Sequence, residues 1–282
     1  MEQFNLTPGE FDDSKAISYN GNLYDIGVTT IRWDNPIGLN AYDTSKFVHW
    51  EEDRKTGKKV KKVVKGKRYG KRWGGISAIK VFALHHTGGY TPEATFRTLH
   101  EIRKLSVPHI LGDNGINYQT LDPIVKAWHI GKMNPISDGV EVCSFADAES
   151  NPGAYSKKKR DKLGVSTHKI VGQFIQGADR EVFELPKSQV DALVKLVAGS
   201  WVARANERGP IYLNNNPAAP LFMVNDEGKV LMNFSKNVKN HEGIILHANS
   251  SEFKWDMAGI VNMEAFEERV SDTFYKFLNK MI

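Results

Sequence analysis

The chain has 282 residues, of which 40% are hydrophobic and 25% are charged, enough for one large globular domain or a domain with an extension. Its single cysteine, Cys143, excludes an intramolecular disulfide and a cysteine-rich zinc knuckle, and we expect it to be a buried, inert thiol. The N-terminus lacks the basic and apolar regions of a signal peptide, and no apolar run is long enough for a membrane span. We therefore expect a soluble chain made in the cytoplasm, with no membrane partner.

The formal net charge of +5 is concentrated in one stretch, RKTGKKVKKVVKGKRYGKR, over residues 54–72. We interpret this stretch as part of a solvated β-hairpin with strands near 46–50 and 60–64 and a turn at Thr56-Gly57. Attraction to an anionic cell-wall polymer or to a partner protein would fit the charge equally well. No nucleic-acid-binding motif accompanies it, so we expect no nucleic-acid partner.

Residues 1–75 are predicted to form a small β-rich extension, with short strands at 23–28 and 30–33 and a junction at Gly74-Gly75. Residues 76–282 alternate between strands and helices, which indicates an α/β domain. The elements expected there are a β-rich run over 76–84, a helix opened by Thr91-Pro92, a hairpin over 107–121, a strand over 139–142, a basic surface loop over 156–162, a long helix from 186, a strand ending at 246 and an amphipathic helix over 263–281.

Two apolar runs of this domain end in histidine. The first, FALHHTGG over residues 82–89, places His85 and His86 before a glycine turn, where α/β folds tend to keep their ligand sites. The second run, 243–246, is followed by His247 and, a few residues later, by Asp256. Two histidines and a carboxylate would make a zinc site with an open fourth position.

The motifs, taken in order, resemble those of the zinc-dependent N-acetylmuramoyl-L-alanine amidases, a group shared by phage endolysins, bacterial muropeptide amidases and peptidoglycan-recognition proteins. The resemblance covers roughly residues 78–282 and leaves the first 75 or so unassigned. It implies a mixed central β-sheet flanked by helices. The motifs that carry it are FALHHTGG (82–89), the segment 106–119, AWHIG (127–131), SDGVEV (137–142), and His247 with Lys254 and Asp256.

This resemblance implies a role for each matching residue. His85, His247 and Asp256 would bind one zinc ion per chain. Glu141 would be the carboxylate that takes the proton of the attacking water, and Lys254 would stabilise the oxyanion of the tetrahedral intermediate.

Three further residues are assigned to substrate binding. His86 would line the groove, hydrogen-bond to a zinc ligand, or merely pack, and these alternatives stay open. His129 would be a groove residue or a support for its loop, and Trp128 would pack in the groove wall. At the hairpin position where some phage members carry a catalytic tyrosine, this chain has Pro108, which shifts the catalytic weight to Glu141.

The resulting functional expectation is hydrolysis of the amide between N-acetylmuramic acid and L-alanine in peptidoglycan. A chain of this kind looks like a phage lysis enzyme or a virion-associated wall-degrading enzyme, released by a holin or delivered by the virion. Residues 1–75 would then dock on a phage structural protein or on the wall. The alternatives are a binding module that holds muropeptide without cutting it and a structural component of a phage particle.

Overall fold

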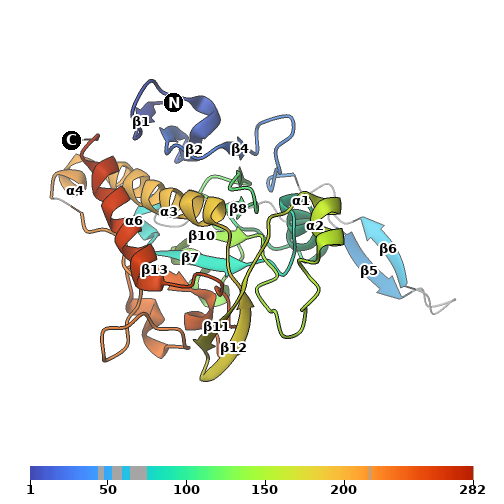
Figure 1. Ribbon diagram of the computed structural model, residues 1–282. Coiled ribbons are helices and arrows are strands. Elements are labelled where there is room, and N and C mark those ends of the chain that lie inside the picture. Colours follow the sequence, from blue (N-terminus) through green and yellow to red (C-terminus); the bar gives the residue numbers. More distant parts are fainter. Residues whose placement is uncertain (44–47, 53–58, 64–74, 216, 282) are drawn as a thin grey trace.

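The centre of the computed structural model is a six-stranded mixed sheet in the order β13-β7-β10-β8-β9-β4 (Figure 1). The structure describes residues 1–43, 48–52, 59–63, 75–215 and 217–281. All neighbouring pairs run parallel except the hairpin of β8 with β9, which is antiparallel. The strands are β4 (Thr30–Arg32), β7 (Val81–His86), β8 (His109–Leu111), β9 (Asn117–Gln119), β10 (Ser137–Val142) and β13 (Gly243–Leu246).

Helices lie against this sheet, which confirms the predicted mixed α/β architecture. The two long ones, α3 and α6, pack against each other and together cover one face (Figure 1). Within the described part of the chain, no helix is both long and apolar enough to cross a membrane. The α-helices are α1 (Pro92–Phe96), α2 (Lys157–Leu163), α3 (Lys187–Glu207), α4 (Pro210–Asn214), α5 (His247–Ser250) and α6 (Met263–Leu278).

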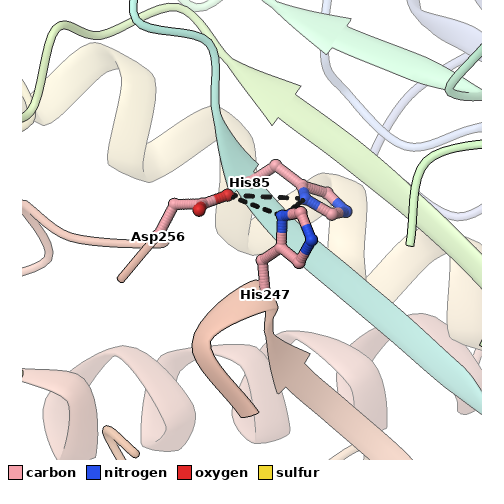
Figure 2. A group of neighbouring side chains, drawn as sticks. All are labelled: His85, His247 and Asp256. Atoms are coloured by element: carbon pink, nitrogen blue, oxygen red, sulfur yellow. Dashed lines mark hydrogen bonds and ion pairs between the residues drawn. The ribbon is translucent and has the colours of Figure 1, made fainter. Parts of the chain in front are cut away.

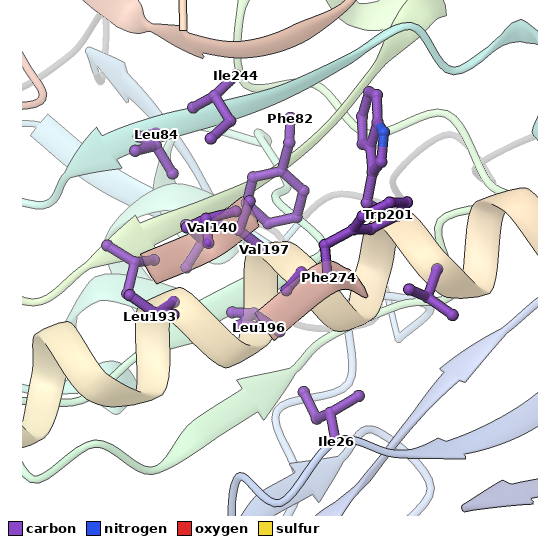
Figure 3. Close-up of a cluster of buried hydrophobic side chains, with 14 of the residues drawn as sticks. Ile26, Phe82, Leu84, Val140, Leu193, Leu196, Val197, Trp201, Ile244 and Phe274 are labelled. Atoms are coloured by element: carbon purple, nitrogen blue, oxygen red, sulfur yellow. The ribbon is translucent and has the colours of Figure 1, made fainter. Parts of the chain in front are cut away.

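Side-chain alternation along the central strands separates the core from the site. Phe82 and Leu84 of β7 point into the main core beneath α3, whereas Val81 and Ala83 belong to a separate apolar cluster. His85 continues the second series and therefore lies on the face away from α3. The neighbouring strands follow the same alternation, so the main core also receives Val142 and Leu246. Val140 and Ile244 belong to it as well (Figure 3).

The N-terminal segment joins the same core. Its strands β1 (Gln3–Asn5), β2 (Ala16–Tyr19) and β3 (Asn22–Asp25) form a three-stranded sheet. β4 then adds to the edge of the central sheet, and Tyr24 and Ile26 belong to the main hydrophobic cluster. Residues 1–32 are thus packed on the domain that follows. The predicted division of the chain into an extension, residues 1–75, and a domain, residues 76–282, stays a prediction.

Two local expectations need correction or restriction. Residues 156–162 were expected to form a loop, but 157–163 form α2, since Lys and Arg are good helix formers and Gly164 ends the helix in a left-handed conformation. The basic hairpin is seen as β5 (Val48–Glu52) paired antiparallel with β6 (Lys59–Val63). Its turn at Thr56-Gly57 and the basic residues 64–72 lie outside the described residues.

Gly199 of α3 lies close to Ile26 of the N-terminal segment. A Cβ added there would lie 2.3 Å from Cγ2 of Ile26. Replacing a helical glycine by alanine ordinarily stabilises a helix by about 1 kcal/mol. We expect Gly199→Ala to lower the free energy of unfolding by about 1–3 kcal/mol instead, because the core is overpacked. Urea denaturation measures this.

The double variant Gly199→Ala with Ile26→Ala is the control for this prediction. Ile26→Ala removes the clashing methyl group, so Gly199→Ala should cost less in that background than in the wild type. Equal costs in the two backgrounds would show that the N-terminal segment does not press on α3.

Asp113 fastens the long segment after β10 to the β8–β9 turn. Its carboxylate accepts hydrogen bonds from the Ser166 N–H at 2.7 Å and from Nε2 of His168 at 2.7 Å, and the His168 ring stacks on Tyr155. Burial acts to raise the pKa of Asp113, but these hydrogen bonds outweigh it and leave the pKa below its ordinary value. The ionised form is therefore the stabilising one.

We expect Asp113→Asn to lower the free energy of unfolding at pH 7 by about 1.5–3 kcal/mol, the usual worth of hydrogen bonds to a charged group. A carboxyl with a depressed folded-state pKa stabilises the fold above its unfolded pKa of about 3.9 and loses that contribution as the pH falls through the folded value. The difference between wild type and variant should therefore shrink in acid. A difference of the same size at pH 7 and pH 2.5 would contradict this account.

Candidate metal centre and cavity

The proposed ligands come from the ends of two adjacent parallel strands and from one loop. His85 lies near the end of β7, and His247 follows β13 directly as the first residue of α5. Residues 243–246 of β13 pair with 81–84 of β7, so the two strands end side by side. Asp256 lies in the irregular segment between α5 and α6. Parallel strands with adjacent carboxyl ends are where α/β sheets bring side chains together.

The three side chains converge on one point (Figure 2). Nδ1 of His85 lies 2.9 Å from Nδ1 of His247 and 3.5 Å from Oδ2 of Asp256. Nδ1 of His247 lies 3.0 Å from the same Oδ2. Among the described residues, His85, His247 and Asp256 form a group that could hold a metal ion.

The donor set fits a zinc ion. In a tetrahedral site, zinc–ligand bonds of about 2.0–2.2 Å place neighbouring donor atoms about 3.3–3.5 Å apart, close to the separations found here. Burial lowers the pKa of His85 to about 4, so this imidazole is neutral and able to ligate at pH 7. Burial would raise the pKa of Asp256, but hydrogen bonds to His247 and His85 hold it well below its ordinary value, which keeps the carboxylate ionised.

A second histidine orients the first. Nε2 of His85 lies 3.0 Å from Nδ1 of His129, and Nε2 of His129 lies 3.0 Å from Oγ of Ser137. Gly139 leaves space for the His129 ring in this series of hydrogen bonds, since a Cβ at position 139 would lie 2.7 Å from that ring. Metal-binding histidines commonly have their other ring nitrogen held in this way. The position of His129 is therefore one of support for His85, and it also lines the cavity.

Glu141 lies beside His85 in the register between β10 and β7 and faces a cavity of about 700 Å³. The same cavity is lined by Asp256 and His247. Burial raises the pKa of Glu141 well above its ordinary value; the Asp256 carboxylate adds to this, and Lys254 and Arg103 oppose it. A buried carboxyl next to a candidate metal centre is suited to proton transfer.

Cationic and apolar groups complete the lining of the cavity. Lys254, solvent-exposed, comes from the same irregular segment as Asp256. Arg103, at the end of the first helical segment, also lines the cavity and was not identified from the sequence. The sequence contained no signal for Arg103, because it reads as an ordinary polar residue on a helix surface. Phe253 is 91% exposed at the rim.

The remaining two predicted residues differ in their placement. His86 lines the cavity, its ring lies 5.1 Å from that of Trp255, and its Nδ1 accepts a 3.5 Å hydrogen bond from the Ala258 N–H. Trp128 is not among the residues that line this cavity; the residue is 45% exposed, and the centroid of its ring lies 4.2 Å from Nζ of Lys126. The assignment of Trp128 to substrate binding stays a prediction.

Solved structures of bacterial and endolysin proteins, two of them named as N-acetylmuramoyl-L-alanine amidases, align with parts of this chain at low identity and low TM-score. AmiD from E. coli, in complex with the substrate anhydro-N-acetylmuramic acid-L-Ala-D-γ-Glu-L-Lys, is 14% identical over 77% of this chain and 64% of its own, with a TM-score of 0.39. AmpDh3 from Pseudomonas aeruginosa, in complex with anhydromuramic pentapeptide, is 13% identical over 68% of this chain and 60% of its own, with a TM-score of 0.40. The endolysin amidase LysCS from Clostridium intestinale URNW is 12% identical over 73% of this chain and 91% of its own, with a TM-score of 0.32.

This chain spans less than two thirds of the length of the first two proteins, 64% and 60%. No protein-family model matches the sequence, and no curated protein matches it either.

The contact between His129 and His85 predicts an effect on metal binding. We expect His129→Ala to weaken zinc affinity by about 10- to 100-fold, because the His85 ring loses the partner that orients it. Competition with a chromophoric chelator measures the affinity. Trp128→Ala is the matched control: it changes the neighbouring residue, which does not contact His85, and should leave zinc affinity unchanged. An unchanged zinc affinity in His129→Ala would show that His129 does not support His85 and only lines the groove.

Proposed function

We propose that this protein is a zinc-dependent hydrolase that cleaves the amide between N-acetylmuramic acid and L-alanine in peptidoglycan. One observation carries the proposal: two imidazole nitrogens and a carboxylate oxygen meet at the edge of a cavity that Glu141 and Lys254 also line. The ordered sequence motifs that resemble the zinc amidases support the choice of substrate.

A zinc ion held by His85, His247 and Asp256 would polarise the scissile carbonyl and make water acidic enough to attack near neutral pH. The other steps fall to the chain itself. Glu141, buried beside His85, takes the proton from the attacking water and passes it to the leaving amine of L-alanine. Lys254 supplies a positive charge for the oxyanion of the tetrahedral intermediate.

The cavity offers both polarities that a muropeptide requires. Arg103 and Lys254 present positive charge to an acidic stem peptide, and Phe253 and Leu163 offer apolar surface at the rim. Net positive charge in a partly enclosed cavity raises the local concentration of anionic substrates.

Glu141→Gln separates proton transfer from metal binding. We expect it to lower turnover by about 100- to 10,000-fold, the usual contribution of a general base, while one zinc per chain is retained. Release of free amino groups from purified peptidoglycan measures turnover, and elemental analysis measures zinc. Asp256→Ala is the contrasting variant and should lose zinc as well as activity. Full activity in Glu141→Gln would remove this residue from the mechanism.

The products of the wild-type protein decide between the proposed enzyme and a binding module. New amino termini on L-alanine without new reducing sugar ends would establish amidase chemistry. Bound zinc and bound peptidoglycan without cleavage would establish a binding module instead.

We further propose that the enzyme serves phage lysis or is carried by a virion, as the sequence resemblance implies. Residues 1–75 would include the docking element. Because residues 1–32 are built into the core of the protein, we assign docking to the hairpin of β5 and β6. Co-purification of the intact chain with virions, and its loss when the hairpin is deleted, tests this assignment.

A further inference from the structure

The segment that carries Lys254 and Asp256 has little regular structure of its own. After the single turn of α5, residues 251–262 contain no strand and no helix, yet they place Lys254 and Asp256. Within the segment and α5, the backbone makes few cross-links, among them Ala248 N–H to Asp256 C=O at 2.6 Å and Lys254 N–H to Ser251 C=O at 3.3 Å. Something outside the segment must therefore hold it.

The turn between β11 (Ile170–Ile175) and β12 (Ala178–Phe183) provides such a support through Gln176. Nε2 of Gln176 donates to three backbone carbonyls, those of Ala248 at 2.9 Å, Ser251 at 3.0 Å and Lys254 at 2.7 Å. Two amide hydrogens serve three acceptors, so one hydrogen is shared. The carbonyl oxygen of Gln176 accepts from the Phe234 N–H at 3.1 Å, which fixes the orientation of the amide.

A second glutamine of the same ribbon holds the other end of the segment. Nε2 of Gln173 donates to the Ile260 carbonyl at 2.6 Å, and its Oε1 accepts from the Gly259 N–H at 2.9 Å. Asp256 thus lies between two stretches of backbone that are each bound to an amide side chain of the ribbon. The two strands of this ribbon, β11 and β12, pair antiparallel over six residues each.

Apolar packing adds to this connection. Ile175 and Val182 of the ribbon form a buried cluster with Ala258, against which Trp255 packs. The ribbon therefore contacts the segment on both sides of Asp256, by hydrogen bonds to the backbone and by apolar contact. Both amides bind the main chain, so they act on position and not on the chemistry of any one side chain.

We infer that Gln173 and Gln176 are positioning residues that fix the segment carrying Lys254 and Asp256 relative to His85. This inference rests on the proposed function for its effect on turnover, but its effect on metal affinity is independent of any reaction. Gln176 holds the carbonyl of Lys254 itself, that of Ser251, and that of Ala248, which follows His247. Gln173 holds the backbone just beyond Asp256.

The test compares three substitutions of Gln176 with one substitution at Gln173 and one at Asp179. Gln176→Ala removes the amide; Gln176→Glu keeps its size but replaces the two donors with an acceptor; Gln176→Asn keeps the amide on a side chain one methylene shorter. Asp179→Asn is the ribbon control, a solvent-exposed residue on β12. Gln173→Ala tests the second support.

Zinc affinity, measured by competition with a chelator, is the first readout. We expect it to fall about 10-fold or more in Gln176→Ala and in Gln173→Ala, the range found when groups behind metal ligands are removed. Gln176→Glu should be at least as damaging as Gln176→Ala, because a carboxylate would face three carbonyl oxygens. If the role were only to fill space, Gln176→Glu would behave like the wild type.

Turnover on purified peptidoglycan is the second readout. With zinc saturating, we expect kcat to fall about 10- to 100-fold in Gln176→Ala with KM changed by less than threefold, because Lys254 is displaced from the reacting carbonyl. A wild-type protein that binds zinc but cleaves nothing would remove the proposed function and leave the affinity test valid.

Wild-type zinc affinity and kcat in folded Gln176→Ala and Gln176→Glu would overturn the inference. Circular dichroism and thermal melting of the metal-free proteins establish that each variant is folded. Should Gln176→Ala not fold, the same comparison between Gln176→Asn and the Asp179→Asn control decides the question, with wild-type affinity in Gln176→Asn as the contradicting result.

Discussion

The register among β10, β7 and β13 is the constraint on which the rest of the molecule depends. In each of these parallel strands, successive side chains point to opposite faces. With Glu141 opposite His85, and Leu246 opposite Leu84, one face of the three strands carries the apolar side chains of the main core together with the buried Asp138, and the other face carries His85 and Glu141. A shift of one residue in any strand would move its functional side chain into the core beneath α3 and an apolar side chain into the cavity.

The two faces have opposite energetic requirements. The face under α3 and α6 is stabilised by close packing of large apolar side chains, among them Phe82, Trp201 and Phe274 (Figure 3). The opposite face buries His85, Glu141 and Asp256, and burying ionisable groups costs free energy unless they are paired. His85 and Asp256 are paired with each other and with His247, whereas the cost at Glu141 appears as a raised pKa. Burial of the apolar face must therefore offset the free-energy cost of burying these ionisable groups.

Some residues of the site lie on regular strands, and others lie on a segment without regular structure. His85 and Glu141 lie on central strands, whose positions follow from the sheet. Lys254 and Asp256 lie on a segment without regular structure, which depends on contacts with a separate ribbon. This division separates the part of the site that the sheet positions from the part that other contacts must position. It also locates the part of the site in which local opening would cost least.

The sequence by itself determined the architecture and the candidate ligands. Apolar runs that end in His85 and His247, a Thr91-Pro92 helix start, the β8–β9 hairpin and the two long helices are local signals, because period, capping and turn chemistry depend on residues a few positions apart. The ordered motifs also placed Glu141 and Lys254 near them. The prediction from local sequence was wrong at 156–162, because a run of charged residues is compatible with a helix as well as with a loop.

Only the tertiary structure decided how these residues meet. The contact of His129 with His85, the entry of Arg103 into the cavity, the packing of Ile26 against Gly199, and the hydrogen bonds of Gln176 to the backbone of 248–254 all join positions far apart in the chain. No pattern along the sequence encodes them, because each depends on where a strand register or a loop path brings a side chain that is unremarkable in its own neighbourhood.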